Sequence, residues 1–233
     1  MNTALQIGGK YMSRLFKTKQ KTVVLPTREL IKMKGTDFRI LSIISILSNV
    51  DNNTLSGKNC RYTNNRKVNN NMKQICKTLG MNTGQVTRAL RNLLKHESDE
   101  FSMVERKIGE TVQYCYEIKY DKGGFVTIPY SKLEKVLIGL SNNCIKLYCN
   151  LLWLCVEDGS LVEKQLTQSY LLELMGLSKT SAKILKIATD TLVEHKLIKI
   201  RREWIVETKI VEGLPVSTTP KEILYYSIVV EED

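Results

Sequence analysis

The sequence predicts a mainly α-helical chain with small β-hairpins, an α+β fold built from two helix-turn-helix units in tandem, each followed by a hairpin. Three observations predict it. One stretch has the spacing of helix, glycine turn and helix; alternating apolar residues follow it; and the same order of patterns recurs in the second half. With 233 residues, 42 % of them hydrophobic, the chain is long enough for two small domains with their own cores.

The first helix-turn-helix is predicted at residues 72–96. Gly80 lies where its first helix must end, because the residue after a helix often needs a positive φ. Asn82 or Thr83 can cap the second helix with a side-chain oxygen. One side of both helices is apolar at helical spacing, through Ile75, Leu79, Val86, Ala89, Leu90, Leu93 and Leu94. The opposite side of the second helix is basic and rich in amides, which is typical of a DNA-recognition helix.

Two runs of alternating apolar residues follow, at 103–107 and 112–119, with Gly109 at the bend between them. This alternation predicts a β-hairpin, and a helix-turn-helix followed by a hairpin is the order of elements in a winged helix. A first winged-helix domain is therefore predicted over residues 22–120. Its earlier part is expected to hold a strand at 22–26, a short helix at 27–34, a core helix at 37–50 and a polar loop at 51–71 with a short strand around 60–63.

The second half repeats this order after a linker at 121–124. A strand at 125–129 and helices at 130–138 and 141–156 precede a helix at 167–175 that ends at Gly176. Ser178 is expected to cap the next helix. A second hairpin is predicted from 197–201 and 204–210, with Arg202 and Glu203 near its tip. These patterns predict a second winged-helix domain at 125–212 and a C-terminal tail at 213–233, in which 223–230 is a candidate strand.

An imperfect duplication links the two halves. VVLPTREL matches VTIPYSKL, CKTLGMN matches LELMGLS, and NLLKHE matches TLVEHK, in the same order along the chain. The last match aligns His96 with His195. Since these two histidines end equivalent helices, we interpret them as groups at the negative end of the helix dipole rather than as metal ligands.

The excess positive charge lies in the N-terminal third. The formal net charge is +11; residues 1–73 contain 14 Lys or Arg and 3 Asp or Glu, whereas residues 74–233 contain 21 of each kind. This asymmetry indicates a polyanionic partner, with nucleic acid first and an acidic membrane surface second. The basic arm at 1–21 fits a poorly ordered tail, an arm that orders on phosphate, or a short amphipathic helix.

Several classes of protein are not indicated. No apolar run is long enough to span a bilayer, and the N-terminus lacks the apolar segment of a signal peptide. The six cysteines contain no C-x-x-C pair, so we expect reduced cysteines in a cytoplasmic protein. Two scattered histidines give no ligand cluster, so neither a metal nor another cofactor is expected. Phosphate-binding loops and hydrolase motifs are missing, which indicates a protein that is not an enzyme.

The expected DNA interface consists of long basic and polar side chains on or beside the two helix-turn-helix units. Arginine can pair with guanine and glutamine with adenine in the major groove, and shorter hydroxyls can contact phosphate. In the first unit these residues are Gln85, Arg88, Arg91 and Lys95 on the second helix, with Thr83 and Thr87 for phosphate, Lys58, Arg61, Arg66 and Lys67 before it, and Arg106 and Lys107 on the hairpin.

The second unit offers a more mixed set. Its basic residues are Lys179, Lys183 and Lys186 on the helix, and Lys199, Arg201 and Arg202 on the hairpin. Acidic residues lie among them, at Glu173, Asp190, Glu194 and Glu203. DNA contact and a protein-interaction role are therefore equally expected for this unit.

The segment FVTIPYSKLEKVLIGLSNNCIKLYCNLLWL followed by LLELMGLSKTSAKILKIATDTLVEHKLI resembles winged-helix domains of plasmid replication initiators and phage replisome organisers, and the N-terminal domain of DnaD-like primosome proteins. The resemblance covers about 22–212 as a hydrophobic and turn pattern. It implies double-stranded origin DNA as the ligand, self-association as a homodimer, and recruitment of host replication proteins. The same pattern also fits a transcriptional repressor or partition protein, and a protein-interaction adaptor remains a third alternative.

Overall fold

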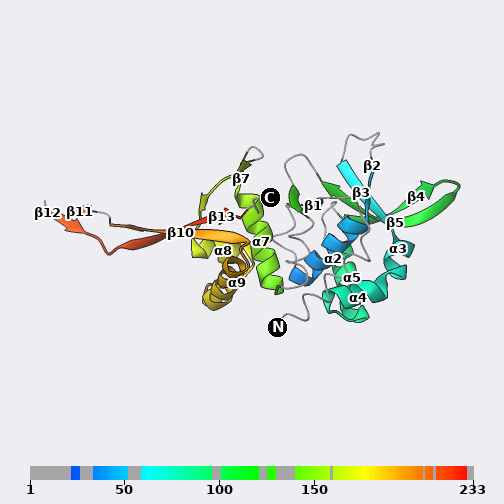
Figure 1. Ribbon diagram of the computed structural model, residues 1–233, viewed down its shortest axis with the longest axis horizontal. Helices are drawn as coiled ribbons and strands as arrows, with labels where there is room; N and C mark the ends of the chain where they lie inside the picture. Colours follow the sequence, from blue (N-terminus) through cyan, green and yellow to red (C-terminus); the bar gives the residue numbers. More distant parts are fainter. Residues whose placement is uncertain are drawn as a thin grey trace. The chain divides into compact units, whose positions relative to one another are not determined.

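The computed structural model describes residues 22–26, 34–51, 59–95, 101–120, 125–129, 140–157, 160–206, 208–211 and 214–229. Helices and strands are mixed, as the α+β class predicts, and the chain divides into two compact units, Met1–Lys146 and Leu147–Asp233 (Figure 1). The division falls inside helix α7 (Asn142–Leu154). The predicted basic arm at 1–21, the linker at 121–124, the short helix at 130–138 and all of the short helix at 27–34 except Lys34 lie outside the described residues.

The first unit is built around a helix that is buried on nearly every side. Helix α2 (Gly35–Leu47) packs against the second helix of the helix-turn-helix, and Ile40, Leu41 and Ile44 are almost inaccessible to solvent. The core helix predicted from 37 is thus confirmed. It ends at Leu47, before the predicted position, because Asn49–Asp51 (β2) pairs with strand β3 instead of continuing the helix.

A four-stranded antiparallel sheet supports this unit, with the strand order β2-β3-β5-β4. Its other strands are β3 (Asn59–Asn64), β4 (Phe101–Ile108) and β5 (Thr111–Tyr120). Three helices connect β3 to β4, namely α3 (Asn65–Asn70), α4 (Met72–Leu79) and α5 (Thr83–Lys95). The predicted strands β1 (Thr22–Pro26) and β6 (Phe125–Pro129) pair with each other antiparallel, with Val24 opposite Thr127.

The turn residues of the first unit behave as their chemistry predicts. Gly80 has φ +62° at the end of α4, and Gly109 has φ +63° at the bend between β4 and β5. Asn82 caps α5 by accepting from the backbone N–H of Gln85 at 2.9 Å. The helix-turn-helix and the hairpin after it are therefore both present at the predicted positions.

Helix α3 lies where the sequence predicts a polar loop, within 51–71. The helix forms because the Asn64 side chain accepts from the backbone N–H of Arg66 at 2.7 Å, and because Val68 turns inward and is fully buried. A single apolar residue among asparagines and cations leaves no periodicity for a sequence pattern to detect.

The second unit has a similar succession of elements. Strands β7 (Val156–Glu157), β8 (Ser160–Leu161) and β9 (Lys164–Gln165) are followed by α8 (Gln168–Leu174), a short 3₁₀ helix η1 (Lys179–Ser181) and α9 (Ala182–Glu194), and then by β10 (Ile198–Ile205), β11 (Thr208–Val211), β12 (Leu214–Ser217) and β13 (Lys221–Ile228). Its main sheet has the order β10-β13-β9. The first unit has the matching order β4-β5-β3, so the last strand lies in the middle of these three in both units.

The predicted second hairpin is wrong in its extent. Strand β10 runs through Arg202 and Glu203, which lie opposite Leu224 and Ile223 of β13 rather than at a tip. Strands β11 and β12 form a separate hairpin that extends from the end of β10 and β13 (Figure 1). The segment predicted as a tail therefore supplies the central strand β13 of this sheet, and the candidate strand at 223–230 is confirmed.

Ser178 does not cap α9, which is a second correction. Ser178 precedes η1, and its hydroxyl contacts the Thr180 and Ser181 hydroxyls at 2.7 and 3.0 Å instead of a backbone N–H. Gly176 has φ +64° after α8, as predicted from its match with Gly80.

Within the part of the chain that the structure describes, no helix is long and apolar enough to cross a membrane.

Candidate nucleic-acid interface

Helix α5 separates an apolar side from a basic side. Its buried side chains are Val86, Ala89, Leu90 and Leu93, and its exposed polar side chains include Thr83, Gln85, Arg88, Arg91 and Lys95. The helix contains no acidic residue. Among the described residues, no carboxylate lies within 4.0 Å of the Arg88, Arg91 or Lys95 cations. These three cations are therefore available to a ligand.

Gln85 has a structural role that the sequence pattern does not reveal. Its Oε1 accepts from the backbone N–H of Asn82 at 2.9 Å, while its own backbone N–H donates to Asn82 Oδ1. This reciprocal pair is a capping box, which satisfies two N–H groups at the start of the helix. The prediction that Gln85 recognises adenine stays a prediction, and a bidentate contact with adenine would have to take this oxygen from the capping box.

The basic residues before α4 are not equivalent. Arg61 is only 6 % exposed within β3, which contradicts the prediction that it lies at the DNA interface. Lys67 is exposed, but its ammonium donates to the carbonyl of Leu47 at 2.9 Å and so completes the C-terminal end of α2. Arg66 is exposed on α3. Lys58 lies outside the described residues.

The two basic residues predicted on the hairpin of the first unit differ in their surroundings. Arg106 is half-buried and lies over the ring of Tyr62, with 4.4 Å from Cζ to the ring centroid. A cation held on an aromatic face in this way supports the strand, and the DNA contact predicted for Arg106 stays a prediction. Lys107, the next residue, is exposed.

The two expected phosphate contacts on α5 also differ, since Thr83 is exposed and Thr87 is half-buried.

The two hairpin arginines of the second unit are neutralised by acidic neighbours. Arg201 donates to Glu163, with 2.6 Å between Nη2 and Oε2, and also to Glu203, and it stacks over the Tyr225 ring at 4.0 Å. These hydrogen bonds raise the pKa of Arg201. Arg202 pairs with Glu222 at 3.2 Å. Because their charge is already compensated, the DNA contact predicted for these arginines would require phosphate to displace the glutamates, and it stays a prediction.

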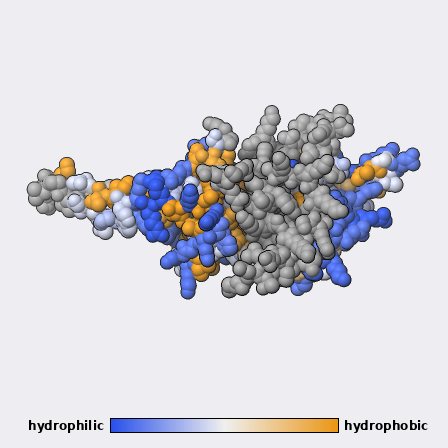
Figure 2. All heavy atoms as spheres, viewed as in Figure 1, coloured by the Kyte–Doolittle hydropathy of each residue, from blue (hydrophilic) through white to orange (hydrophobic). Residues whose placement is uncertain are grey.

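Helix α9 presents a mixed surface. Lys183 and Lys186 are exposed, as are Lys179 on η1 and Lys199 on β10. Ile184 and Ile187 lie on the same helix, 39 % and 56 % exposed, and Asp190 and Glu194 are exposed as well. Trp204, Val206 and Ile210 of the same unit are exposed as well, and Figure 2 shows apolar surface on this projecting part of the unit. This surface suits a protein partner as well as it suits DNA.

The histidines and cysteines are the remaining side chains that could carry chemistry, and those described lie at a helix end or are mostly buried. His195 ends α9 as its C-cap residue and is exposed, while His96 lies outside the described residues. In the described ranges no group of three His, Cys, Asp or Glu side chains could hold a metal ion. Five of the six cysteines are buried, and burial raises the pKa of Cys155 to about 11.

Comparisons with known proteins identify no family for this chain. No family model matches the sequence, and no curated protein matches it either. Among solved structures, the chain is similar to a protein described as the Pi initiator protein in complex with iteron DNA. That similarity has a TM-score of 0.47 and 10 % sequence identity, and covers 92 % of this chain and 100 % of the other.

Proposed function

We propose that this chain binds double-stranded DNA sequence-specifically and acts at a plasmid or phage replication origin as an initiator or organiser. The observation that carries the proposal is the exposed side of α5, with three cations and no acid. Arginine side chains on such a helix are long enough to reach guanine in the major groove, and a lysine at its end neutralises phosphate. In this role the chain is a binding protein and not an enzyme.

The arrangement of both units supports a tandem winged-helix architecture. The helix-turn-helix lies between β3 and β4 in the first unit and between β9 and β10 in the second, and the strand that follows returns to the middle of the sheet. In a winged helix the second helix enters the major groove and the hairpin approaches the backbone beside it. The duplication gives the chain two such modules, which suits a long or repeated DNA site better than a single short one.

The DNA target can be identified by selection from random sequence. Selection of bound duplexes from such a pool should yield one consensus, and footprinting on the chain's own replicon should then show an array of repeats. The affinity should fall steeply as salt rises, because each neutralised phosphate releases counterions. One palindrome beside a promoter would instead favour the repressor alternative, with the chain bound as a symmetric dimer.

A protein-interaction role is the second candidate, and it rests on α9. The exposed Ile184 and Ile187 are unusual for a helix that meets only phosphate and polar base edges, and they suit a docking surface for a host replication protein or a second copy. Failure to select any duplex at low salt, with a stable protein complex recovered instead, would favour an adaptor over a DNA-binding protein.

A further inference from the structure

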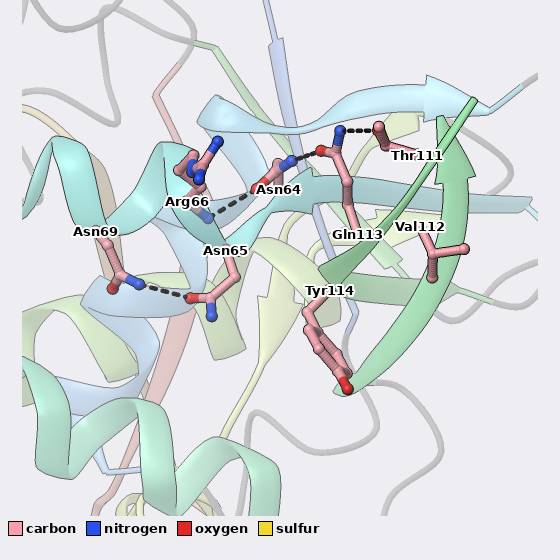
Figure 3. Close-up of a pocket in the computed structure, with 8 residues that line it drawn as sticks. All are labelled: Asn64, Asn65, Arg66, Asn69, Thr111, Val112, Gln113 and Tyr114. Carbon is pink, nitrogen blue, oxygen red and sulfur yellow. Dashed lines mark hydrogen bonds between the residues drawn. The ribbon is translucent and has the colours of Figure 1, made fainter. Parts of the chain in front are cut away.

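A polar pocket lies between the start of α3 and the hairpin strand β5 in the first unit. Its volume is about 490 Å³, and Figure 3 shows Gln113 on β5 reaching toward Asn64 at the start of α3. The pocket is lined by Asn64, Asn65, Arg66, Asn69, Thr111, Val112, Gln113 and Tyr114. This lining combines four amides with one arginine and contains no carboxylate, so it suits a ligand that carries hydrogen-bonding edges and negative charge.

One wall of the pocket is fixed by its own hydrogen bonds. Asn64 accepts from the backbone N–H of Arg66 and donates to Gln113 Oε1, and Gln113 Nε2 donates to the Thr111 hydroxyl at 2.8 Å. These bonds connect the helix start to the strand. The pocket is therefore formed before any ligand arrives, which lowers the cost of binding.

The other wall keeps hydrogen-bonding capacity for a ligand. Asn69 Nδ2 donates to Asn65 Oδ1 at 3.2 Å, which leaves Asn65 Nδ2 as a donor and Asn69 Oδ1 as an acceptor. A neighbouring donor and acceptor match the edge of a nucleobase. The Tyr114 ring is 57 % exposed beside them and offers a face for stacking. The guanidinium of Arg66 is exposed at the same pocket and suits a phosphate.

We propose that this pocket binds one unpaired nucleobase of a DNA strand. In a duplex the base edges are reached by side chains that project into a groove, whereas a concave pocket with an aromatic wall accepts a base only after it has left the stack. The inference rests on the proposed function, because an initiator acts where the strands of the origin separate. It gives the first unit a second contact that a repressor of intact duplex does not need.

The test uses the full chain with two probes, a fluorescein-labelled oligothymidylate of about 20 nucleotides and the duplex obtained by selection. Tyr114→Thr removes the ring at an exposed strand position and should weaken oligothymidylate binding about tenfold. The matched variant Tyr114→Phe keeps the ring and should bind within about twofold of the parent chain. Duplex affinity should stay within about twofold of the parent chain in both variants, because α5 and the hairpin cation Lys107 are unchanged.

Asn69→Ala provides an independent readout, since alanine favours the helix and the side chain is exposed. It should weaken oligothymidylate binding as well. The inference is overturned if neither Tyr114→Thr nor Asn69→Ala changes the affinity for oligothymidylate, or if Tyr114→Phe lowers that affinity as much as Tyr114→Thr does. It is also overturned if the parent chain binds oligouridylate more tightly than oligothymidylate and the same two variants weaken that binding. If the chain selects a duplex but does not bind oligothymidylate, the pocket proposal is refuted and the proposed duplex function stands. If the chain binds oligothymidylate but selects no duplex, only the proposed duplex function is refuted.

Discussion

Helices α5 and α9 occupy equivalent places in two units of matching strand order, yet they present different surfaces. The exposed side of α5 is basic and free of acids, whereas that of α9 combines lysines with isoleucines and carboxylates. Their buried sides remain alike, with Leu93 and Leu192 both completely inaccessible. The comparison shows that two units can share an order of elements and an apolar buried side while their solvent-exposed positions carry different chemistry.

The largest expected difference between the units is in duplex affinity. Arg88→Ala combined with Arg91→Ala should weaken binding to the selected duplex about a hundredfold or more, since a bidentate arginine–guanine contact contributes about 1–3 kcal/mol. The matched change in the second unit, Lys183→Ala with Lys186→Ala, should cost less than about fivefold, as expected for a weak or absent phosphate contact. Fluorescence anisotropy measures both. Equal losses would show that α9 contributes as much as α5.

The two glycine turns should respond alike, in contrast to the helices that follow them. Gly80→Ala and Gly176→Ala each place a β-carbon at a positive φ and should lower the free energy of unfolding by about 1–2 kcal/mol. Gly84→Ala, in the first turn of α5, is the control and should change the free energy of unfolding by less than about 0.5 kcal/mol, since the better helix preference of alanine is offset by a β-carbon 3.3 Å from Asn82 Oδ1. Urea unfolding followed by circular dichroism measures all three. Tolerance of Gly80→Ala alone would mean that the two turns are not equivalent.

A buried thiol and a buried phenol should lower the stability of the folded second unit at alkaline pH. Burial raises the pKa of Cys155 to about 11 and that of Tyr226 to about 12, so the folded chain retains protons that the unfolded chain releases above about pH 9. Stability is therefore present below about pH 9 and falls as pH rises toward 11, by about 1 kcal/mol for Cys155 after solvent screening. Cys155→Ala should flatten the slope of unfolding free energy over this range. An unchanged slope would contradict the assigned cause.

The features that the sequence predicts correctly are those set by local chemistry. Gly80 and Gly109 adopt positive φ, and Asn82 caps α5, because each conformation depends on the residue itself and its immediate neighbours. The strands at 22–26 and 125–129 also follow from local composition. Their pairing with each other does not, since nothing within either segment specifies a partner that is about a hundred residues away in sequence.

The features that the sequence does not reveal depend on neighbours that are distant along the chain. Arg61 is buried by the sheet, and Arg201 is compensated by Glu163, which lies 38 residues earlier. The sequence pattern places the tip of the second hairpin too early, because the charged pair Arg202 and Glu203 is typical of a turn. In the structure both residues lie within β10 and pair with β13. A sequence pattern identifies which residues can bind an anion, but only the tertiary structure shows which of them are already paired.

The hairpins of the two units offer the finest distinction, because Lys107 is exposed without an acidic partner among the described residues, whereas Arg201 is held by two glutamates. Lys107→Gln should reduce the slope of log affinity against log salt by about one, together with a loss of a few-fold in duplex affinity, if the exposed ammonium neutralises one phosphate. Arg201→Gln should leave that slope unchanged, since its charge is compensated by Glu163 and Glu203. Anisotropy titrations at several salt concentrations resolve the two slopes. If Arg201→Gln reduced the slope as much as Lys107→Gln, then DNA must displace both glutamates, and the second hairpin would belong to the interface after all.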